Sequence, residues 1–193
     1  AGSGAKTEAA LATKLAGRIR KRGLTAVSHT VGADLLVLDE AQRKAAVDRL
    51  KRKVEIAAKL GCTRMRHDVA RGFPKDYKGP KTWDAALKYI VPACREVAEY
   101  AKSFGIISSM ENHGYFAQAS ERVLKLVKAV DHPNFGITID IGNFLCVDEE
   151  PVPAVRRLAK YASHVHVKDF HRKSKRDDPG QGFFRTAGGN FLR

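Results

Sequence analysis

The sequence predicts an α/β protein whose parallel sheet is arranged as part of a (β/α)8 barrel. Three observations predict this fold: a helix–strand unit recurs, no strand leads into a phosphate-binding loop, and polar residues gather where the strands end. Each unit is an amphipathic helical stretch, a short break that often contains glycine, and an apolar run of strand character. Such spacing is typical of βα units rather than hairpins, and right-handed crossovers then make the sheet parallel.

The helix–strand unit occurs five times, and its apolar runs begin near residues 24, 62, 106, 136 and 163. The first two units are "LAGRIRKRG" followed by "LTAVSHT" and "VEIAAKLG" followed by "CTRMRHDV". The next two are "VAEYAKSFG" followed by "IISSMENH" and "VLKLVKAVDHPNFG" followed by "ITIDIGNF". The last is "AVRRLAKY" followed by "ASHVHVKDF", and it alone has no glycine in its break.

Open doubly wound sheets and barrels both use such units, and the strand ends favour the barrel. No GxGxxG or GxxxxGK[ST] follows a strand, so the usual nucleotide-binding loop of the open sheet is absent. Polar residues instead stand at successive strand ends, as at the catalytic rim of a barrel. These residues are His29, His67, Glu111 to His113, Asp140, Asn143, His166 and Lys168.

The number of units limits the architecture. Five strands cannot close a parallel barrel, which needs eight, so we expect either an open sheet or part of a larger protein. The connection 68–82, rich in Gly, Pro and Lys, is expected to form a loop over the rim. Residues 7–193 are expected to form a single partial-barrel domain, and residues 1–6, "AGSGAK", a flexible start or a tag scar.

The composition indicates a globular protein that does not enter a membrane. No apolar run approaches the roughly 18 residues of a membrane helix, and no signal peptide opens the chain. Cys62, Cys94 and Cys146 are an odd number without CxxC spacing, so neither a disulfide framework nor a zinc ribbon is predicted. A cytoplasmic location is therefore expected.

The formal net charge of +14 raises the expectation of phosphorylated substrates, nucleic acid or anionic surfaces. Many basic residues lie in helical stretches such as "RIRKRG", "DRLKRKVE" and "VRRLAK", where a solvated outer face explains them. The charge is weak evidence for function, and nucleic acid is not expected as a partner.

Three side chains at strand ends form a candidate metal site. Glu111 in "SSMENHG", Asp140 in "ITIDIGN" and His166 in "HVHVKD" each end a predicted strand. Two carboxylates and an imidazole suit Mn²⁺, Mg²⁺, Co²⁺ or Zn²⁺ and leave coordination positions for substrate oxygens. Taken singly, Asp140 is equally typical of a cap or turn and Glu111 of a loop carboxylate, but together the three favour a metal.

The stretch "ASHVHVKDFHR" adds polar residues beside this site. Strand alternation places His164, His166 and Lys168 on one face. His164 lies deeper on the strand, so we interpret it as a core histidine or a neighbour of the metal ligands. Lys168 is expected to contact substrate, the alternative being a lysine that extends from the barrel mouth into solvent.

The motifs "MENHG", "DIGNF" and "HVHVKD", in this order and spacing, resemble the xylose-isomerase-like sugar phosphate isomerase/epimerase superfamily. That superfamily also includes ketose epimerases, inosose dehydratases and AP-endonuclease-type nucleases. The resemblance covers nearly the whole chain and implies a (β/α)8 TIM barrel with a divalent metal held by Glu, Asp, His and a second Glu. Glu111, Asp140 and His166 match the first three ligands.

The resemblance also implies further roles. Glu111 is expected to be one of two glutamates that move the substrate proton, and Lys168 to neutralise developing charge. "HVHVKDFHR" followed by "PGQG" resembles the ketose epimerases, in which an arginine six residues past the metal histidine contacts the site, here Arg172. The residues expected to bind substrate are His67, His113, Asn143, Lys168 and Arg172.

The sequence departs from the family pattern at two points. Asn143 stands where many members have a histidine three residues after the metal aspartate, which alters a substrate or second-metal contact. Aligned in this way, the five strands correspond to the family's third to seventh, and the last strand with the second glutamate is missing. We therefore expect a truncated member, poor in catalysis and in metal binding, whose open edges pair with another copy or a complementing chain.

The function expected is a divalent-metal-dependent sugar or sugar phosphate isomerase or epimerase. It would remove a proton beside a carbonyl and pass through an enediolate. The alternatives are a dehydratase or lyase acting on a keto-sugar or inosose, an AP-endonuclease-type nuclease, and a non-catalytic fragment. A three-zinc nuclease site would need further histidines such as His29, His67 and His113.

Overall fold

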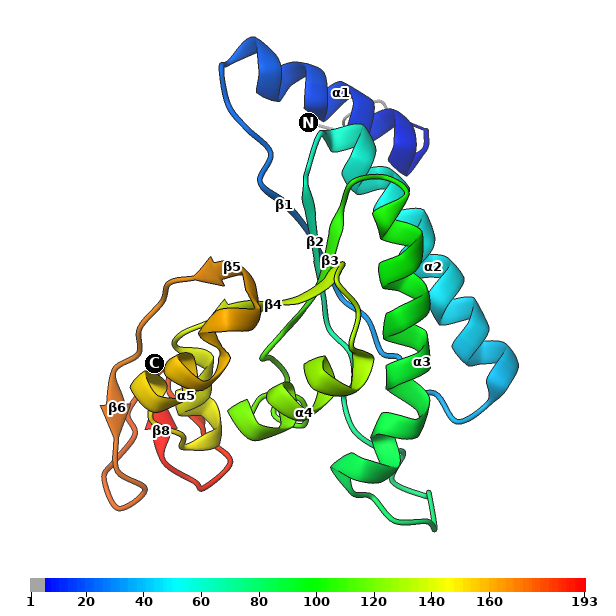
Figure 1. Cartoon of the computed structure of the whole chain (residues 1–193). Helices are drawn as coiled ribbons and strands as arrows, with labels where there is room; N and C mark the ends of the chain where they lie inside the picture. The colour runs from blue at the N-terminus through cyan, green and yellow to red at the C-terminus, as the bar shows by residue number, and fades with distance from the viewer. Residues whose placement is uncertain (1–5) are drawn as a thin grey trace.

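A computed structural model describes residues 6–193 and contains a five-stranded parallel sheet (Figure 1). The strands, in both chain order and sheet order, are β1 (Ser28–Val31), β2 (Arg64–His67), β3 (Ile107–Glu111), β4 (Phe135–Asp140) and β5 (Ala162–His166). All neighbouring pairs are parallel, which confirms the predicted succession of βα units. The predicted flexible start or tag scar at 1–6 lies, except for Lys6, outside the described residues.

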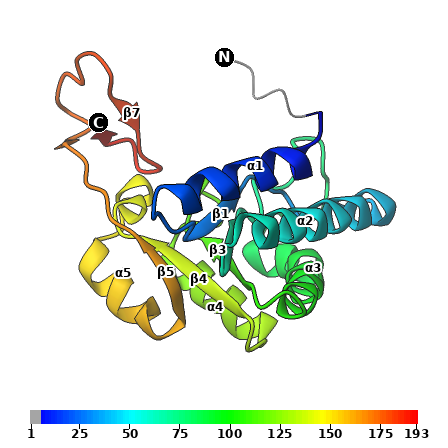
Figure 2. The same ribbon diagram turned by 90° about the horizontal axis from the view of Figure 1, so that it is seen from above.

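The helices follow the curve of the sheet along one side (Figure 2). They are α1 (Glu8–Lys21), α2 (Glu40–Leu60), α3 (Trp83–Lys102), α4 (Ser120–Val130) and α5 (Pro151–Leu158). Each helix contacts the next in chain order. Thr7, Asp39 and Thr82 begin the first three helices by accepting backbone N–H groups of the first turn. This arc of helices around a parallel sheet is the arrangement of part of a TIM barrel.

Two strand boundaries differ from the sequence prediction. β1 begins at Ser28 rather than near residue 24, because its pairing with β2 starts at Ser28 and Arg64. β5 ends at His166, where its ladder with β4 ends opposite Asp140. Lys168 therefore lies beyond the strand, and the expected alternation that put it on the face of His166 does not extend that far.

Register divides the sheet into a helix-facing side and an inner side. Met65 pairs with Ser108, and His67 pairs with Met110, which in turn pairs with Ile137. The apolar residues among these are fully buried in the core beneath the helices. Alternate residues point to the opposite side, where the hydroxyls of Ser109 and Thr138 meet at 3.0 Å. Arg66 pairs with Ser109 in register and so shares this inner side.

A second, antiparallel sheet follows the barrel segment and was not predicted. It consists of β6 (Arg172–Lys173), β7 (Phe184–Arg185) and β8 (Phe191–Leu192), in the order β6-β8-β7. Asp148, just after the 3₁₀ helix η1 (Asn143–Val147), fastens this segment. Its carboxylate accepts hydrogen bonds from Thr186 Oγ1 at 2.8 Å, Gly188 N at 2.6 Å and Asn190 Nδ2 at 2.7 Å. A short second 3₁₀ helix, η2 (Ala159–Tyr161), leads into β5.

Among the described helices, none is both long and apolar enough to cross a membrane.

Candidate metal centre

The ends of three neighbouring strands bring Glu111, Asp140 and His166 together. Each is the last residue of its strand, β3, β4 and β5 respectively. One donor atom from each lies within 4.8 Å of the others, and both carboxylates are buried. Within residues 6–193, this is the only cluster of three or more His, Cys, Asp or Glu side chains close enough to hold a metal.

Glu111 is held by one carboxylate oxygen and directs the other toward the cluster. Its Oε2 forms an ion pair with Arg66 Nε. Its Oε1 accepts a hydrogen bond from Asn143 Nδ2 at 3.2 Å and lies 3.5 Å from His166 Nδ1. The side chain therefore meets the cluster with a single oxygen.

Asp140 is fixed by its own backbone neighbourhood. Its Oδ1 accepts the N–H groups of Gly142 and Asn143, each at 3.1 Å, and its Oδ2 lies 3.4 Å from Lys168 Nζ. The Asn112 side chain donates to the Asp140 carbonyl at 2.9 Å and accepts the Asp140 N–H at 2.8 Å. Like Glu111, Asp140 has one oxygen anchored by the fold, and its other oxygen lies beside Lys168.

Gly142 is required by a close approach at this site. A Cβ at position 142 would lie 2.8 Å from both Cγ and the carbonyl oxygen of Lys168. Because the second of these is a backbone atom, it cannot move aside cheaply. Glycine here lets the segment after β5 run directly beside the turn that holds Asp140.

The three donors suit a divalent cation in their chemistry and nearly in their spacing. Metal–ligand bonds of roughly 2.0–2.2 Å place two ligands of one ion no more than about 4.4 Å apart. The donor atoms lie within 4.8 Å of one another, so the side chains would move closer together to share one ion. Two carboxylates and one imidazole match Mn²⁺, Co²⁺ or Zn²⁺. That these residues hold a metal remains a prediction.

Some of the residues predicted to bind substrate lie at the cluster and others do not. Asn143 is buried within the cluster, and Lys168 borders it. His113 lies on the rim, where its Nδ1 is 2.9 Å from Asp68 Oδ1. Arg172 instead pairs with Glu150 at 3.0 Å on the exposed start of the antiparallel sheet, so the structure does not bring it to the cluster.

His67 does not face the cluster. It is fully buried on the helix-facing side, with Nδ1 2.9 Å from the Asp68 carbonyl and Nε2 3.0 Å from Ser108 Oγ. Its parity on β2 is the physical reason, because it shares a face with Met65 rather than with Arg66. The apolar Met65 between two arginines could have marked that face as the core side.

Arg66 and Asp68 reach the site and were missed by the sequence analysis. Arg66 Nη2 lies 2.9 Å from Asp68 Oδ1, the same oxygen that contacts His113. Asn112 was likewise missed as a ligand-positioning residue, although it directly follows Glu111 in "MENHG". The alternation of Arg66 and Asp68 on one face was the available signal for the first two.

Burial and hydrogen bonding shift the pKa values around the cluster in opposite directions. Hydrogen bonding to Asp68 raises the pKa of His113. Burial raises the pKa of Asp68, but hydrogen bonding to His113 and the charge of Arg66 outweigh it, so the net shift is downward. Burial lowers the pKa of His67 to about 4, which keeps that imidazole neutral. Burial, followed by the neighbouring His166 and Arg64, lowers the pKa of His164.

His164 lies beside the cluster rather than in it. Its ring centroid is 5.3 Å from that of His166, with the two rings nearly perpendicular. This position agrees with the interpretation of His164 as a neighbour of the metal ligands.

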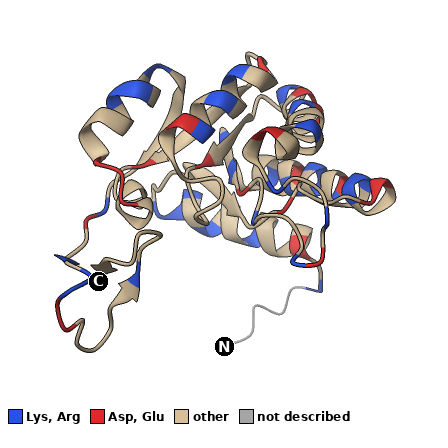
Figure 3. Cartoon of the chain, turned by 90° about the horizontal axis from the view of Figure 1, so that it is seen from below, with Lys and Arg blue, Asp and Glu red and all other residues tan. Residues whose placement is uncertain are grey.

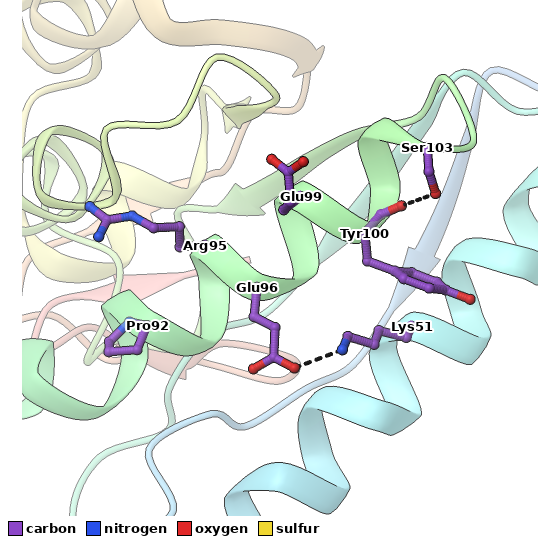
Figure 4. A pocket seen from close by; sticks show the side chains of 7 residues that line it. All are labelled: Lys51, Pro92, Arg95, Glu96, Glu99, Tyr100 and Ser103. Atoms are coloured by element: carbon purple, nitrogen blue, oxygen red, sulfur yellow. Dashed lines mark hydrogen bonds and ion pairs between the residues drawn. The ribbon is translucent and has the colours of Figure 1, made fainter.

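No other group of side chains among the described residues forms a candidate metal site. Lys and Arg are spread over the helices together with Asp and Glu (Figure 3). A hollow of about 640 Å³ lies between α2 and α3 on the outside of the helix layer, lined by Lys51, Glu96 and Tyr100 among others (Figure 4). None of its lining residues belongs to the cluster.

Comparison with known proteins gives one family and a set of related folds. The family model described as "Xylose isomerase-like TIM barrel" matches residues 3–188. The uncharacterized protein YihM of Escherichia coli (strain K12) is 26% identical over 142 residues, which is 74% of this chain and 40% of that protein.

Among solved structures, D-psicose 3-epimerase with D-tagatose from Clostridium cellulolyticum H10 is similar. It has a TM-score of 0.68 and 23% identity and covers 89% of this chain and 60% of its own. The IOLI protein with a bound zinc atom has a TM-score of 0.68 and 16% identity and covers 88% of this chain and 63% of its own. The chain thus spans about two fifths of the curated relative and about three fifths of these structures.

Proposed function

The chain belongs to the xylose isomerase-like TIM barrel family, and on this premise we propose that it carries part of a divalent-metal-dependent sugar isomerase or epimerase. The observation that carries the proposal is the convergence of Glu111, Asp140 and His166 at the carboxyl edge of the sheet. In barrels of this kind, catalytic groups come from the ends of several strands at that edge. The solved structures of an epimerase and of a zinc-containing protein with the same fold support the proposal.

The reaction proposed is removal of a proton from the carbon beside a sugar carbonyl, followed by its return. A bound divalent ion would act as a Lewis acid that stabilises the negative charge of the enediolate formed from the sugar. Glu111 is proposed to accept the proton. Asn143, which donates to Glu111 Oε1, is proposed to help orient this carboxylate.

Lys168 is proposed to offset negative charge on the substrate. Its ammonium lies 3.4 Å from Asp140 Oδ2 and 5.0 Å from the centre of the Phe170 ring, so it borders the cluster from the side of the segment after β5. A cation at this position suits either the charge that develops on the sugar or a phosphate group of a sugar phosphate. Because Arg172 pairs with Glu150, Lys168 rather than Arg172 is the proposed partner of that charge.

The test is hydrogen exchange rather than full turnover, because exchange needs only the first half of the reaction. D-fructose or D-tagatose is incubated in D₂O with the 193-residue chain and Mn²⁺, and deuterium beside the carbonyl is followed by NMR. We expect exchange that Glu111→Gln lowers by at least about 100-fold, since a general base contributes roughly 10²–10⁴-fold. Glu96→Gln, on the outer surface of α3, is the matched control.

The outcomes separate the candidate reactions. Exchange that survives Glu111→Gln would show that another group is the base. Exchange accompanied by loss of water would identify a dehydratase. No exchange in the wild-type chain with any added divalent metal would contradict the proposal for this chain.

A further inference from the structure

Arg66 is a buried arginine whose side chain joins the metal cluster to the strands beside it. It lies on β2, next to β3, and its side chain is 7% exposed. Nε pairs with Glu111 Oε2, Nη2 lies 2.9 Å from Asp68 Oδ1, and Nη1 donates to the Val31 carbonyl at 3.3 Å. All three nitrogens of the guanidinium are engaged, so its plane is fixed.

This arrangement determines how Glu111 meets the cluster. The planar guanidinium occupies Oε2 and leaves Oε1 directed toward Asn143 and His166. A carboxylate held in this way presents a single oxygen in a set direction. Without Arg66, Oε2 of Glu111 would lose its partner on the β2 side, and the hydrogen bond from Asn143 to Oε1 alone would leave the carboxylate free to turn about that contact.

The neighbouring arginine on the same strand shows that this role is specific to Arg66. Arg64 lies two residues earlier on β2 and therefore shares its face. Its Nε donates to the Ser163 carbonyl at 2.6 Å and its Nη1 to Thr63 Oγ1 at 3.0 Å. Arg64 thus contacts β5 and the residue before its own strand, and has no contact with Glu111 or Asp140 among its hydrogen bonds.

We propose that Arg66 is the positioning residue that orients Glu111 for metal binding, with Asp68 fixing Arg66 in turn. The inference rests on the proposed function, because it concerns the same cluster. Electrostatics and positioning predict opposite effects. Removing a positive charge beside a cation site strengthens cation binding by Coulomb's law, whereas loss of an orienting partner weakens it.

The experiment measures Mn²⁺ affinity by titration calorimetry for the wild-type chain and three variants. We expect Arg66→Met to weaken binding about 10- to 100-fold, the usual cost of removing a partner that orients a ligand. Arg66→Lys should recover only part of the loss, because one ammonium cannot reproduce the planar fork shared between two carboxylates. Arg64→Met, the same change on the same face, should stay within about twofold of wild type. Thermal melting shows that each variant is folded. If Arg66→Met does not fold, the Mn²⁺ affinity of Arg66→Lys tests the inference instead.

Binding by Arg66→Met that equals or exceeds wild type would overturn the inference and leave Arg66 as a competing cation. Full recovery by Arg66→Lys would also overturn it, since charge alone would then suffice.

Crystal structures of the metal-free wild type and the folded Arg66 variant give an independent readout. Glu111 should leave its place when the guanidinium is removed, and an unmoved Glu111 would overturn the inference. A wild-type chain that binds no Mn²⁺ would instead count against the metal-dependent function, while the position of Glu111 would still decide the role of Arg66.

Discussion

On β3, Met110 packs among the helices while its neighbours Ser109 and Glu111 point to the other side of the sheet. All three are buried, yet their partners differ completely. Met110 contacts an apolar core, whereas Ser109 bonds to Thr138 and Glu111 to Arg66. Burial alone therefore does not distinguish the two faces of this sheet, whereas the odd or even position of a residue along its strand does.

The largest expected effect on stability comes from the helix-facing side. Met110→Ala removes a fully buried side chain and leaves a cavity beneath the helices, so we expect a loss of about 2–5 kcal/mol in the free energy of unfolding. Ser109→Ala, the adjacent change on the inner side, should cost less, about 1–2 kcal/mol, through loss of its hydrogen bonds to Thr138 Oγ1 and the Met65 carbonyl. Urea denaturation of both variants measures the difference, and equal losses would refute the division of the two faces.

The second prediction concerns pH and the buried His67. Its pKa of about 4 lies below the ordinary 6.5, so the unfolded chain binds a proton that the folded chain does not between these values. Stability contributed by this neutral imidazole is therefore present above pH 6.5 and falls as the pH is lowered, by roughly 3 kcal/mol in total at about pH 4.

The measurement is the free energy of unfolding between pH 7 and 4.5 for wild type and His67→Gln. Carboxylates add a background slope to both proteins, so the difference between them isolates the histidine. His67→Gln should lose less stability than wild type across this range. Parallel curves would show that His67 takes up its proton as readily in the folded chain as in the unfolded chain, against its placement on the core side.

The smallest expected effect concerns the rim of the inner side. Lys168→Met should change stability by less than about 1 kcal/mol, because its ion pair with Asp140 is partly exposed. If Lys168 contacts substrate, the exchange of deuterium into sugar should fall about tenfold. Lys160→Met, an exposed lysine on η2, is the control. An unchanged exchange rate would return Lys168 to the interpretation of a solvated lysine.

The alternation of side chains along each strand also limited what could be predicted from the sequence. The order of helices and strands followed from glycine breaks and apolar runs, and Glu111, Asp140 and His166 could be placed at one edge because parallel strands end there. His67 was assigned to that edge by the same reasoning, but an edge has two faces, and only register separates them.

Other features depend on contacts that no local pattern encodes. Arg66 reaches Glu111 across the sheet over 45 residues of sequence, so its partner could not be found from "RMRHD" alone. The antiparallel sheet was missed because its strands are two residues long, too short to show alternation. Arg172 was carried to the site by resemblance, whereas in this chain it lies on β6, opposite Leu192 of β8, and pairs with Glu150.

The Asp148 carboxylate, which accepts hydrogen bonds from Thr186, Gly188 and Asn190, links the C-terminal segment to the chain after η1. The three hydrogen bonds to this carboxylate, together with that from Ala187 N to the Cys146 carbonyl at 2.8 Å, hold residues 186–190 to one short stretch of chain, so these residues should open as one cooperative unit of local unfolding. Such an opening leaves the five-stranded sheet intact, since Asp148 lies outside its ladders. Asp148 directly follows η1, which starts at Asn143. Residues 186–190 are therefore hydrogen-bonded to a residue only eight positions after Asp140.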